Sequence, residues 1–196
     1  MRSTKTEKRL SKIVSVVKAR QNSLRVVMEN IHDPHNVSAI FRTCDAVGIP
    51  KISLIYNSES FPRIGKKSSA SAYKWVEKEK FKSVEECFQS LRDDGFRIYS
   101  SSISNDSKSL YDLDFTKKAA IVVGNEHRGV SDEAANLSDE KFLIPQFGMV
   151  QSLNVSVATA VILYEALRQR RNINLYSKSD FSDSEIDELV DKWCRK

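Results

Sequence analysis

The segment from Val155 to Leu167 is nearly continuous in Val, Ala, Ile and Leu, and it constrains the fold more than any other part of the chain. It is too short to cross a membrane, which needs about 20 apolar residues. A helix that is apolar on all sides must be buried. A chain of 196 residues with 40% hydrophobic content can supply one core that buries it. We therefore expect one main domain, with this helix inside it or at a subunit interface.

Short apolar runs with strand character alternate with helical stripes along the rest of the chain. The expected strands are residues 24–28, 51–56, 96–100, 119–123 and 141–144. The expected helices between them are residues 36–47, a segment opened by Ser83 and stopped by Gly95, and a short acidic helix before the last strand. This alternation is typical of an α/β fold with a mostly parallel, doubly wound sheet. The polar residues 57–71 predict a long, mobile loop.

Both ends of the chain predict helices outside this sheet. Residues 6–21 place an apolar stripe among basic side chains. Ser182 and Glu185 have the spacing of a capping box, and the apolar stripe that follows runs to Trp193. We therefore divide the chain into a basic N-terminal helix (1–22), a main domain (23–172) and a C-terminal extension with a helix (173–196).

Charge and cysteine content narrow the class of protein. The net charge of +5 modestly favours an acidic partner such as a nucleic acid. The chain has no signal-peptide pattern and no run of about 18 apolar residues, so we expect a cytoplasmic protein without a membrane partner. Its three cysteines lie far apart and predict neither a disulfide framework nor a zinc site.

The glycine pattern argues against the common nucleotide sites. The chain contains neither G-x-G-x-x-G nor a phosphate-binding P-loop, and it also lacks H-E-x-x-H and G-x-S-x-G. The sequence therefore argues against four classes of protein: a standard dinucleotide-binding protein, a kinase, a zinc protease and a serine hydrolase.

Three polar clusters follow expected strands, where open α/β sheets place their ligands. In the first, Asn36 and Arg42 could bracket a phosphate or carboxylate, or could instead be a helix cap and a surface arginine. His32 and His35 lack further metal ligands nearby, and we predict no metal site.

The second and third clusters are suited to a ligand held by the backbone. Gly124 and Gly129 flank a charged turn that contains Glu126, so the main chain there could approach a ligand closely. Ser152 and Asn154 belong to a small, amide-rich run at the start of the apolar helix, and such groups could hold a purine ring. An ordinary turn and a helix cap are the structural alternatives.

Together the clusters closely resemble the three motifs of the TrmH branch of the SPOUT RNA methyltransferases. The similar segments are NIHDPHNVSAIFRTCDAVGI, IVVGNEHRGVS and IPQFGMVQSLNVSVATAVILYEALRQRR, and the resemblance extends over about residues 24–171. It implies a homodimer that transfers a methyl group from S-adenosylmethionine to a ribose 2′-hydroxyl of tRNA, most similar to the enzymes for guanosine 18 in the D-loop. It also implies a deep trefoil knot in the C-terminal part of the sheet, and active sites that take residues from the partner.

The resemblance also assigns roles to individual residues. The implied catalytic residues are Asn36, Arg42, Glu126, Ser152 and Asn154, and the implied cofactor-binding residues are Ser101, Gly124, Ile144, Met149 and Leu153. Arg42 would activate the 2′-hydroxyl, either by losing its own proton or by holding a phosphate whose oxygen accepts the hydroxyl proton. The other four catalytic residues would orient Arg42 and the ribose.

Several points stay open from the sequence. The candidate contacts to the tRNA backbone are the basic N-terminal helix, Arg63, Lys66, Lys67 and the cluster of residues 168–171, and each could equally be a solvated charge. A related methyltransferase acting on rRNA or on another tRNA ribose is the main alternative. A non-catalytic RNA-binding protein of the same fold is another.

Overall fold

The computed structural model describes residues 2, 5–63 and 72–196, and seven strands within them form one parallel sheet. The strands are β1 (Leu24–Glu29), β2 (Lys51–Ile55), β3 (Glu77–Phe81), β4 (Arg97–Ser101), β5 (Lys108–Ser109), β6 (Ala119–Val123) and β7 (Glu140–Leu143). Their order is β3-β2-β1-β6-β4-β7-β5. The predicted α/β class with a parallel sheet is confirmed. The order of β4 to β7 differs from a simple doubly wound sheet, because β7 lies between β4 and β5; the trefoil knot stays a prediction.

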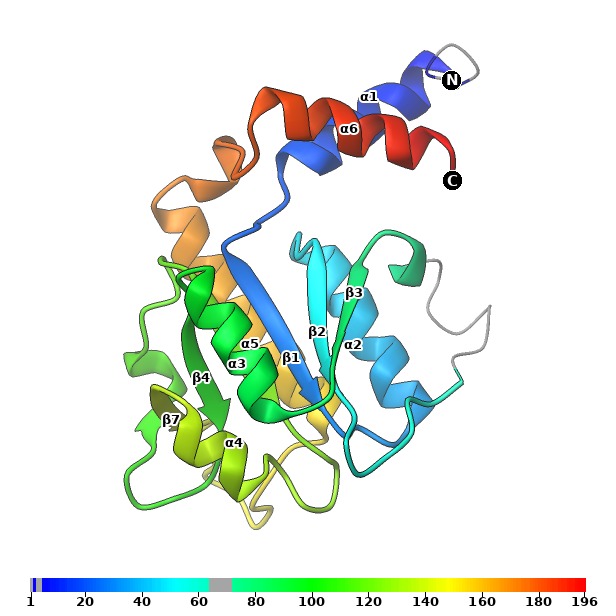
Figure 1. Ribbon diagram of the computed structural model, residues 1–196. Coiled ribbons are helices and arrows are strands. Elements are labelled where there is room, and N and C mark those ends of the chain that lie inside the picture. Colours follow the sequence, from blue (N-terminus) through cyan, green and yellow to red (C-terminus); the bar gives the residue numbers. More distant parts are fainter. Residues whose placement is uncertain (1, 3–4, 64–71) are drawn as a thin grey trace.

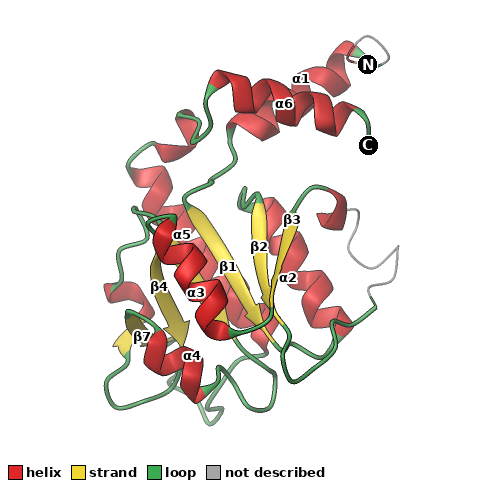
Figure 2. Ribbon diagram, viewed as in Figure 1, coloured by secondary structure: helices red, strands yellow, loops and turns green. Residues whose placement is uncertain are grey.

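Helices cover both faces of the sheet (Figures 1 and 2). Helices α2 (Pro34–Ala46) and α5 (Val155–Asn172) pack in the apolar core on one face. Helices α3 (Val84–Asp93) and α4 (Asp132–Leu137) lie on the other face, over a second core. Three short 3-10 helices, η2 (Ala72–Lys74), η3 (Leu110–Asp112) and η4 (Leu175–Ser177), complete the described elements of the main domain and its C-terminal connection. Side chains of β1 and β6 alternate between the two cores, as expected for strands that are buried on both faces.

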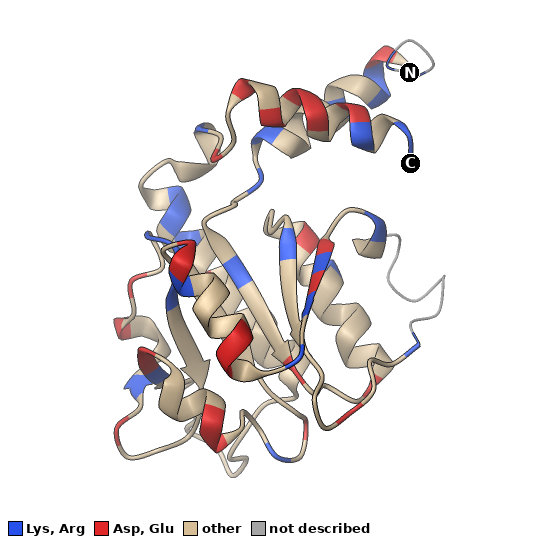
Figure 3. Ribbon diagram, viewed as in Figure 1, with Lys and Arg blue, Asp and Glu red and all other residues tan. Residues whose placement is uncertain are grey.

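The two terminal helices pair with each other above the amino ends of the strands (Figure 1). Helix α1 (Glu7–Lys18) and helix α6 (Asp183–Cys194) share a third apolar cluster, in which Trp75 and Trp193 lie 4.8 Å apart between ring centroids. Both predicted helices are confirmed, and α6 packs on its own chain. Figure 3 shows that α6 is largely acidic beside the basic residues of α1. The division of the chain into three segments stays a prediction.

Each of the three apolar clusters contains one of the three cysteines. Cys44 lies with α2, Cys87 with α3 and Cys194 with α6, and all three are buried and unpaired. Burial raises the pKa of the Cys44 and Cys87 thiols. These two thiols therefore stay protonated and unreactive in the folded chain.

Two strands of the sheet, β3 and the two-residue β5, are not among the strands expected from the sequence. The strand β3 has the sequence EKEKF, whose alternating charges hide it from a search for apolar runs. Such charges are common on an edge strand, because they discourage pairing with other molecules. In the single chain the helix α5 is partly exposed, with Val157 and Tyr164 at 49% and 54% exposure. Its predicted burial at a subunit interface stays a prediction. The outer part of the predicted mobile loop, with Lys66 and Lys67, lies outside the described residues.

A buried arginine fastens the end of α5 to two distant segments. The Arg170 side chain is fully buried, and its guanidinium donates five hydrogen bonds of 2.7 to 3.2 Å. The acceptors lie before β1, on Gln21 and Ser23, and before β6, on the carbonyls of Phe115 and Lys117. Arg170 is therefore neither a candidate contact to tRNA nor a solvated charge, since its N–H groups all bond inside the protein.

We predict that Arg170→Ala lowers the free energy of unfolding by about 3 kcal/mol or more, because it leaves several buried acceptors without a partner. Chemical denaturation monitored by circular dichroism measures the loss. The matched control is Arg171→Ala, next to it on the same helix but exposed, with an expected change below about 0.5 kcal/mol. Equal losses in both variants would contradict the structural role of Arg170.

Candidate active site

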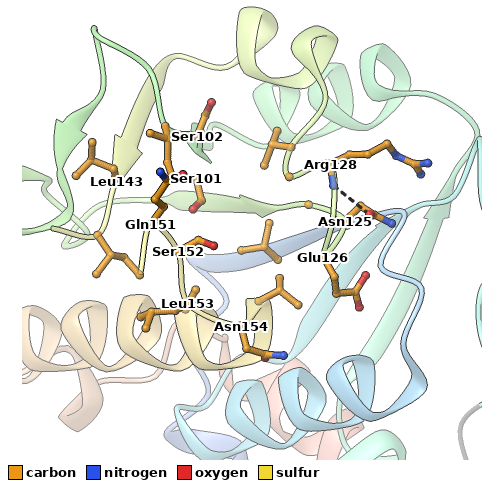
Figure 4. A pocket seen from close by; sticks show the side chains of 18 of the residues that line it. Ser101, Ser102, Asn125, Glu126, Arg128, Leu143, Gln151, Ser152, Leu153 and Asn154 are labelled. Atoms are coloured by element: carbon orange, nitrogen blue, oxygen red, sulfur yellow. Dashed lines mark hydrogen bonds between the residues drawn. The ribbon is translucent and has the colours of Figure 1, made fainter. Parts of the chain in front are cut away.

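A polar cavity of about 610 Å³ opens at the carboxyl ends of β4, β6 and β7 (Figure 4). Its wall consists of the residues that follow these three strands, together with the loop that leads into α5. The carboxyl ends of parallel strands meet at one edge of a sheet, which is why segments far apart in the sequence converge here. The predicted convergence of the second and third clusters is confirmed.

Most of the predicted cofactor-binding residues line this cavity. They are Ser101, Gly124, Ile144 and Leu153. Met149 differs, because its side chain is 100% exposed and it does not belong to the wall formed by the described residues. Its predicted contact with a cofactor stays a prediction.

Gly124 is required at its position because a side chain has no room there. A Cβ atom built on Gly124 would lie 2.1 Å from the carbonyl oxygen of Gly129, far inside van der Waals contact. The turn between the two glycines folds back so tightly that its two ends touch through their backbones. A bare backbone therefore faces the cavity at the end of β6, as the glycine pattern predicts.

The amide of Asn125 closes this turn. Its Oδ1 accepts the backbone N–H groups of His127 at 2.9 Å and Arg128 at 3.2 Å, and its Nδ2 donates to the carbonyl of Asn30 at 2.8 Å. Figure 4 shows the bond from Arg128. Asn125 is not among the site residues predicted from the sequence, although an amide between Gly124 and Glu126 at a strand end is a signal for such a bond.

Glu126 joins the second cluster to the first. Its carboxylate accepts hydrogen bonds from the Asn36 side chain at 3.0 Å and from the backbone N–H groups of Asp33 at 3.0 Å and His32 at 3.1 Å. Partial burial raises the pKa of Glu126, but the bonds from Asn36, His32 and Asp33 outweigh burial, so the pKa is lowered. Glu126 is therefore an ionised acceptor at neutral pH and not a proton donor.

The start of α2 differs from the sequence interpretation. The N-cap is Asp33, whose side chain accepts the His35 N–H, and Pro34 occupies the first turn. Asn36 is therefore not the cap. It is buried in the first turn and faces Glu126.

The remaining predicted catalytic residues lie in two places. Ser152 and Asn154 line the cavity with Glu126 (Figure 4), and Asn154 also caps α5, since its Oδ1 accepts from the Ser156 N–H at 2.9 Å. Arg42 is exposed on α2 and is not part of the cavity wall that the described residues form. Seven of the ten predicted site residues therefore line the cavity of the single chain. Asn36 is joined to it through Glu126, whereas Arg42 and Met149 are not part of the wall that the described residues form.

Metal-binding and membrane-spanning features are both missing from the described part of the chain. Among the described residues, no group of three or more His, Cys, Asp or Glu side chains is arranged to hold a metal ion. Within the same residues, no helix combines the length and apolar character that crossing a membrane requires.

Comparisons with known proteins identify the family. The model of the SpoU rRNA Methylase family matches residues 23–164, which include the sheet and the cavity. The chain belongs to the SpoU methylase family. A SpoU relative from Thermus thermophilus, named tRNA (guanosine(18)-2'-O)-methyltransferase, is 41% identical over 98% of both chains.

Solved structures of SpoU proteins have the same fold. The TrmH/SpoU tRNA-modifying enzyme of A. aeolicus superposes with a TM-score of 0.90 at 40% identity, and 95% of each chain is covered. The SpoU methyltransferase AviRb from Streptomyces viridochromogenes, solved in complex with the cofactor AdoMet, has a TM-score of 0.69 at 26% identity over 80% of this chain and 64% of its own.

We predict that Gly124→Ala destabilises the fold by about 1–3 kcal/mol, because the added methyl group forces apart the two ends of the turn. Thermal unfolding measures the loss. The control is Gly148→Ala, where a Cβ meets nothing within 4 Å. A stability loss of the same size in Gly148→Ala would contradict the steric argument.

We predict that Glu126→Gln lowers the free energy of unfolding by about 1–2 kcal/mol at pH 7, because its amide cannot accept all three N–H donors. The pKa of Glu126 is lowered on folding, so its contribution is complete above the ordinary carboxyl value of about 4.3 and fades as the pH falls through the lowered folded value. Urea unfolding of the two proteins from pH 7 to pH 3 tests this. A pH-independent difference, or an equal loss in the exposed control Glu188→Gln, would refute the assignment.

Proposed function

We propose that this protein is an S-adenosylmethionine-dependent methyltransferase that modifies a ribose 2′-hydroxyl of tRNA in the cytoplasm, at guanosine 18 of the D-loop. The observation that carries the proposal is the convergence of seven predicted site residues on one cavity. They are Ser101, Gly124, Glu126, Ile144, Ser152, Leu153 and Asn154. The tRNA position is supported by the name of the Thermus relative, which matches over nearly the whole chain.

The cavity fits a small cofactor held by backbone groups. Its volume of about 610 Å³ lies within the usual range for small-molecule sites. Gly124 exposes bare backbone where any side chain would collide with Gly129, and Leu153 and Ile144 line the same cavity. These residues would hold S-adenosylmethionine, which supplies a methyl group on a positively charged sulfur.

The residues of the chain supply orientation and charge to this reaction. The carboxylate of Glu126 fixes the first turn of α2 through Asn36, and Arg42 lies further along the same helix. A fixed helix aims the guanidinium, which either takes part in removing the proton from the 2′-hydroxyl or holds the neighbouring phosphate. Glu126 itself accepts three hydrogen bonds, so it acts by positioning.

We infer that the active form is a homodimer and that a second copy places Arg42 at the cavity. Arg42 is not among the described residues that line the cavity of its own chain. The neighbouring helix α5 carries a half-exposed apolar stripe with Val157 and Tyr164, which a second copy would cover.

An rRNA substrate is the second candidate, because the description of the matching family names rRNA. The deciding experiment incubates the purified protein with labelled S-adenosylmethionine and either unmodified tRNA or unmodified rRNA, and maps the methylated nucleoside. A 2′-O-methyl group at guanosine 18, lost in a tRNA with adenosine there, is the expected result. Methylation of rRNA alone would show that the substrate is rRNA and not tRNA. If calorimetry detects no binding of S-adenosylmethionine, the protein is a non-catalytic RNA-binding protein and the proposal is refuted.

We predict that Arg42→Ala abolishes turnover, with cofactor affinity and dimer mass unchanged, because the proposed role of Arg42 is toward the ribose and its phosphate. Methyl transfer, calorimetry and light scattering measure the three properties. Wild-type turnover in this variant would refute the role of Arg42.

Mixed dimers test whether Arg42 acts on the partner's cavity. Arg42→Ala is unfolded and refolded at equal amounts with Ser152→Ala, which we expect to inactivate the cavity. If Arg42 acts on the partner's cavity, the mixture recovers about a quarter of the wild-type rate. Half of the dimers are then mixed, and one of the two sites in each mixed dimer has both an intact Arg42 and an intact Ser152. Action within one chain restores nothing.

A further inference from the structure

Asn30, directly after β1, has an unusual backbone conformation. Its φ is 50°, and Asn30 and Asn174 are the two non-glycine residues with positive φ in the described part of the chain. Asn tolerates this region better than most residues, but the conformation is still unfavourable and persists where surrounding contacts impose it. Asn30 is also 7% exposed, so its polar groups need partners inside the protein.

Every polar group of Asn30 has such a partner, and the partners belong to two neighbouring strand ends. On the β2 side, its N–H donates to Ile55 O at 2.9 Å, its Nδ2 donates to Asn57 Oδ1 at 2.8 Å, and its Oδ1 accepts the N–H groups of Ser58 and Glu59 at 3.2 Å each. On the β6 side, its carbonyl accepts from Asn125 Nδ2 at 2.8 Å. Asn30 therefore joins the ends of β2, β1 and β6, which are adjacent in the sheet.

Both arms of this network reach groups at the mouth of the cavity. Through Asn125, Asn30 is connected to the turn that presents Glu126, the residue that fixes the start of α2. Through Glu59, it is connected to Arg128, because the Glu59 carboxylate accepts from Arg128 Nη2 at 2.9 Å. Arg128 lines the cavity and is 60% exposed, so it is available to an RNA phosphate.

We propose that Asn30 is a positioning residue for methyl transfer, one that sets the RNA-facing loops after β1, β2 and β6 relative to the cofactor cavity. The inference rests on the proposed function. Asn30 does not belong to the cavity wall that the described residues form, and among those residues its side chain bonds only to the loop after β2. Its contact with the turn of Gly124 runs through its backbone carbonyl, which a change of side chain leaves in place. Its loss should therefore impair the use of RNA and leave cofactor affinity intact.

Three variants separate positioning from general stability. Asn30→Gly permits the positive φ but removes all three side-chain hydrogen bonds. Asn30→Asp keeps both N–H contacts, and the Asn57 amide can rotate so that its NH₂ group donates to the new carboxylate. Asn174→Gly is the control, since Asn174 has a similar φ of 59° and makes no side-chain capping bond at the start of η4.

The experiment measures kcat and KM for unmodified tRNA, the Kd for S-adenosylmethionine by calorimetry, and Tm, all for the 196-residue protein. For Asn30→Gly we expect kcat/KM for tRNA to fall about tenfold or more while the cofactor Kd changes less than about twofold. Asn30→Asp should recover most of this loss, and Asn174→Gly should keep wild-type kcat/KM.

If Asn30→Gly folds, two results would overturn the proposal and leave the proposed function intact. One is wild-type kcat/KM in Asn30→Gly, and the other is a cofactor Kd that weakens in step with kcat/KM, which would show a general collapse of the site. If Asn30→Gly does not fold, failure of the folded Asn30→Asp to exceed one tenth of the wild-type kcat/KM also overturns it. A wild-type protein that methylates no RNA refutes the proposed function and this inference together.

Discussion

The buried guanidinium of Arg170 is the contact on which the arrangement of the domain depends. Burying a charge is costly unless every donor is satisfied, and five internal hydrogen bonds meet that condition here. The acceptors precede β1 and β6, the two strands at the centre of the sheet. The bonds therefore hold the far end of α5 to the sheet, and a helix fixed at that end presents Leu153 and Asn154 at the cavity with its other end.

The site has two parts that differ in the groups they provide. The ends of β4, β6 and β7 provide backbone and small residues, because Gly124 leaves no space for a side chain. The loops after β1 and β2 are held by a hydrogen-bonded network instead. Glu126, from the turn after β6, accepts N–H groups of the loop after β1, and Asn30 accepts N–H groups of the loop after β2. One part suits a compact cofactor, and the other suits the positioning of a large substrate.

The sequence predicts those features that depend on local pattern. Apolar runs in the sequence predicted β1, β2, β4, β6 and β7. Because ligands bind at the carboxyl ends of parallel strands, the sequence also pointed to the region of Gly124, Glu126 and Ser152, which line one cavity. Features that depend on distant partners were missed. The strand β3 was missed because it is an edge strand with alternating charges. The position of β7 between β4 and β5 follows from long-range pairing, and the bond from Asn125 to Asn30 joins residues 95 positions apart. The residue pattern and the resemblance both pointed to Arg42, but neither showed that it lies outside the cavity wall of its own chain, because that depends on how α2 packs on the sheet.

The three cysteines can report local opening of the folded chain, because each lies in a different apolar cluster. Cys44, Cys87 and Cys194 each occupy a different apolar cluster, so a thiol reagent reaches each of them after a different layer has opened. Alkylation followed site by site by mass spectrometry would thus resolve whether the paired terminal helices detach before either face of the sheet loosens. The same placement shields the sulfur atoms from oxidants, which attack exposed thiolates.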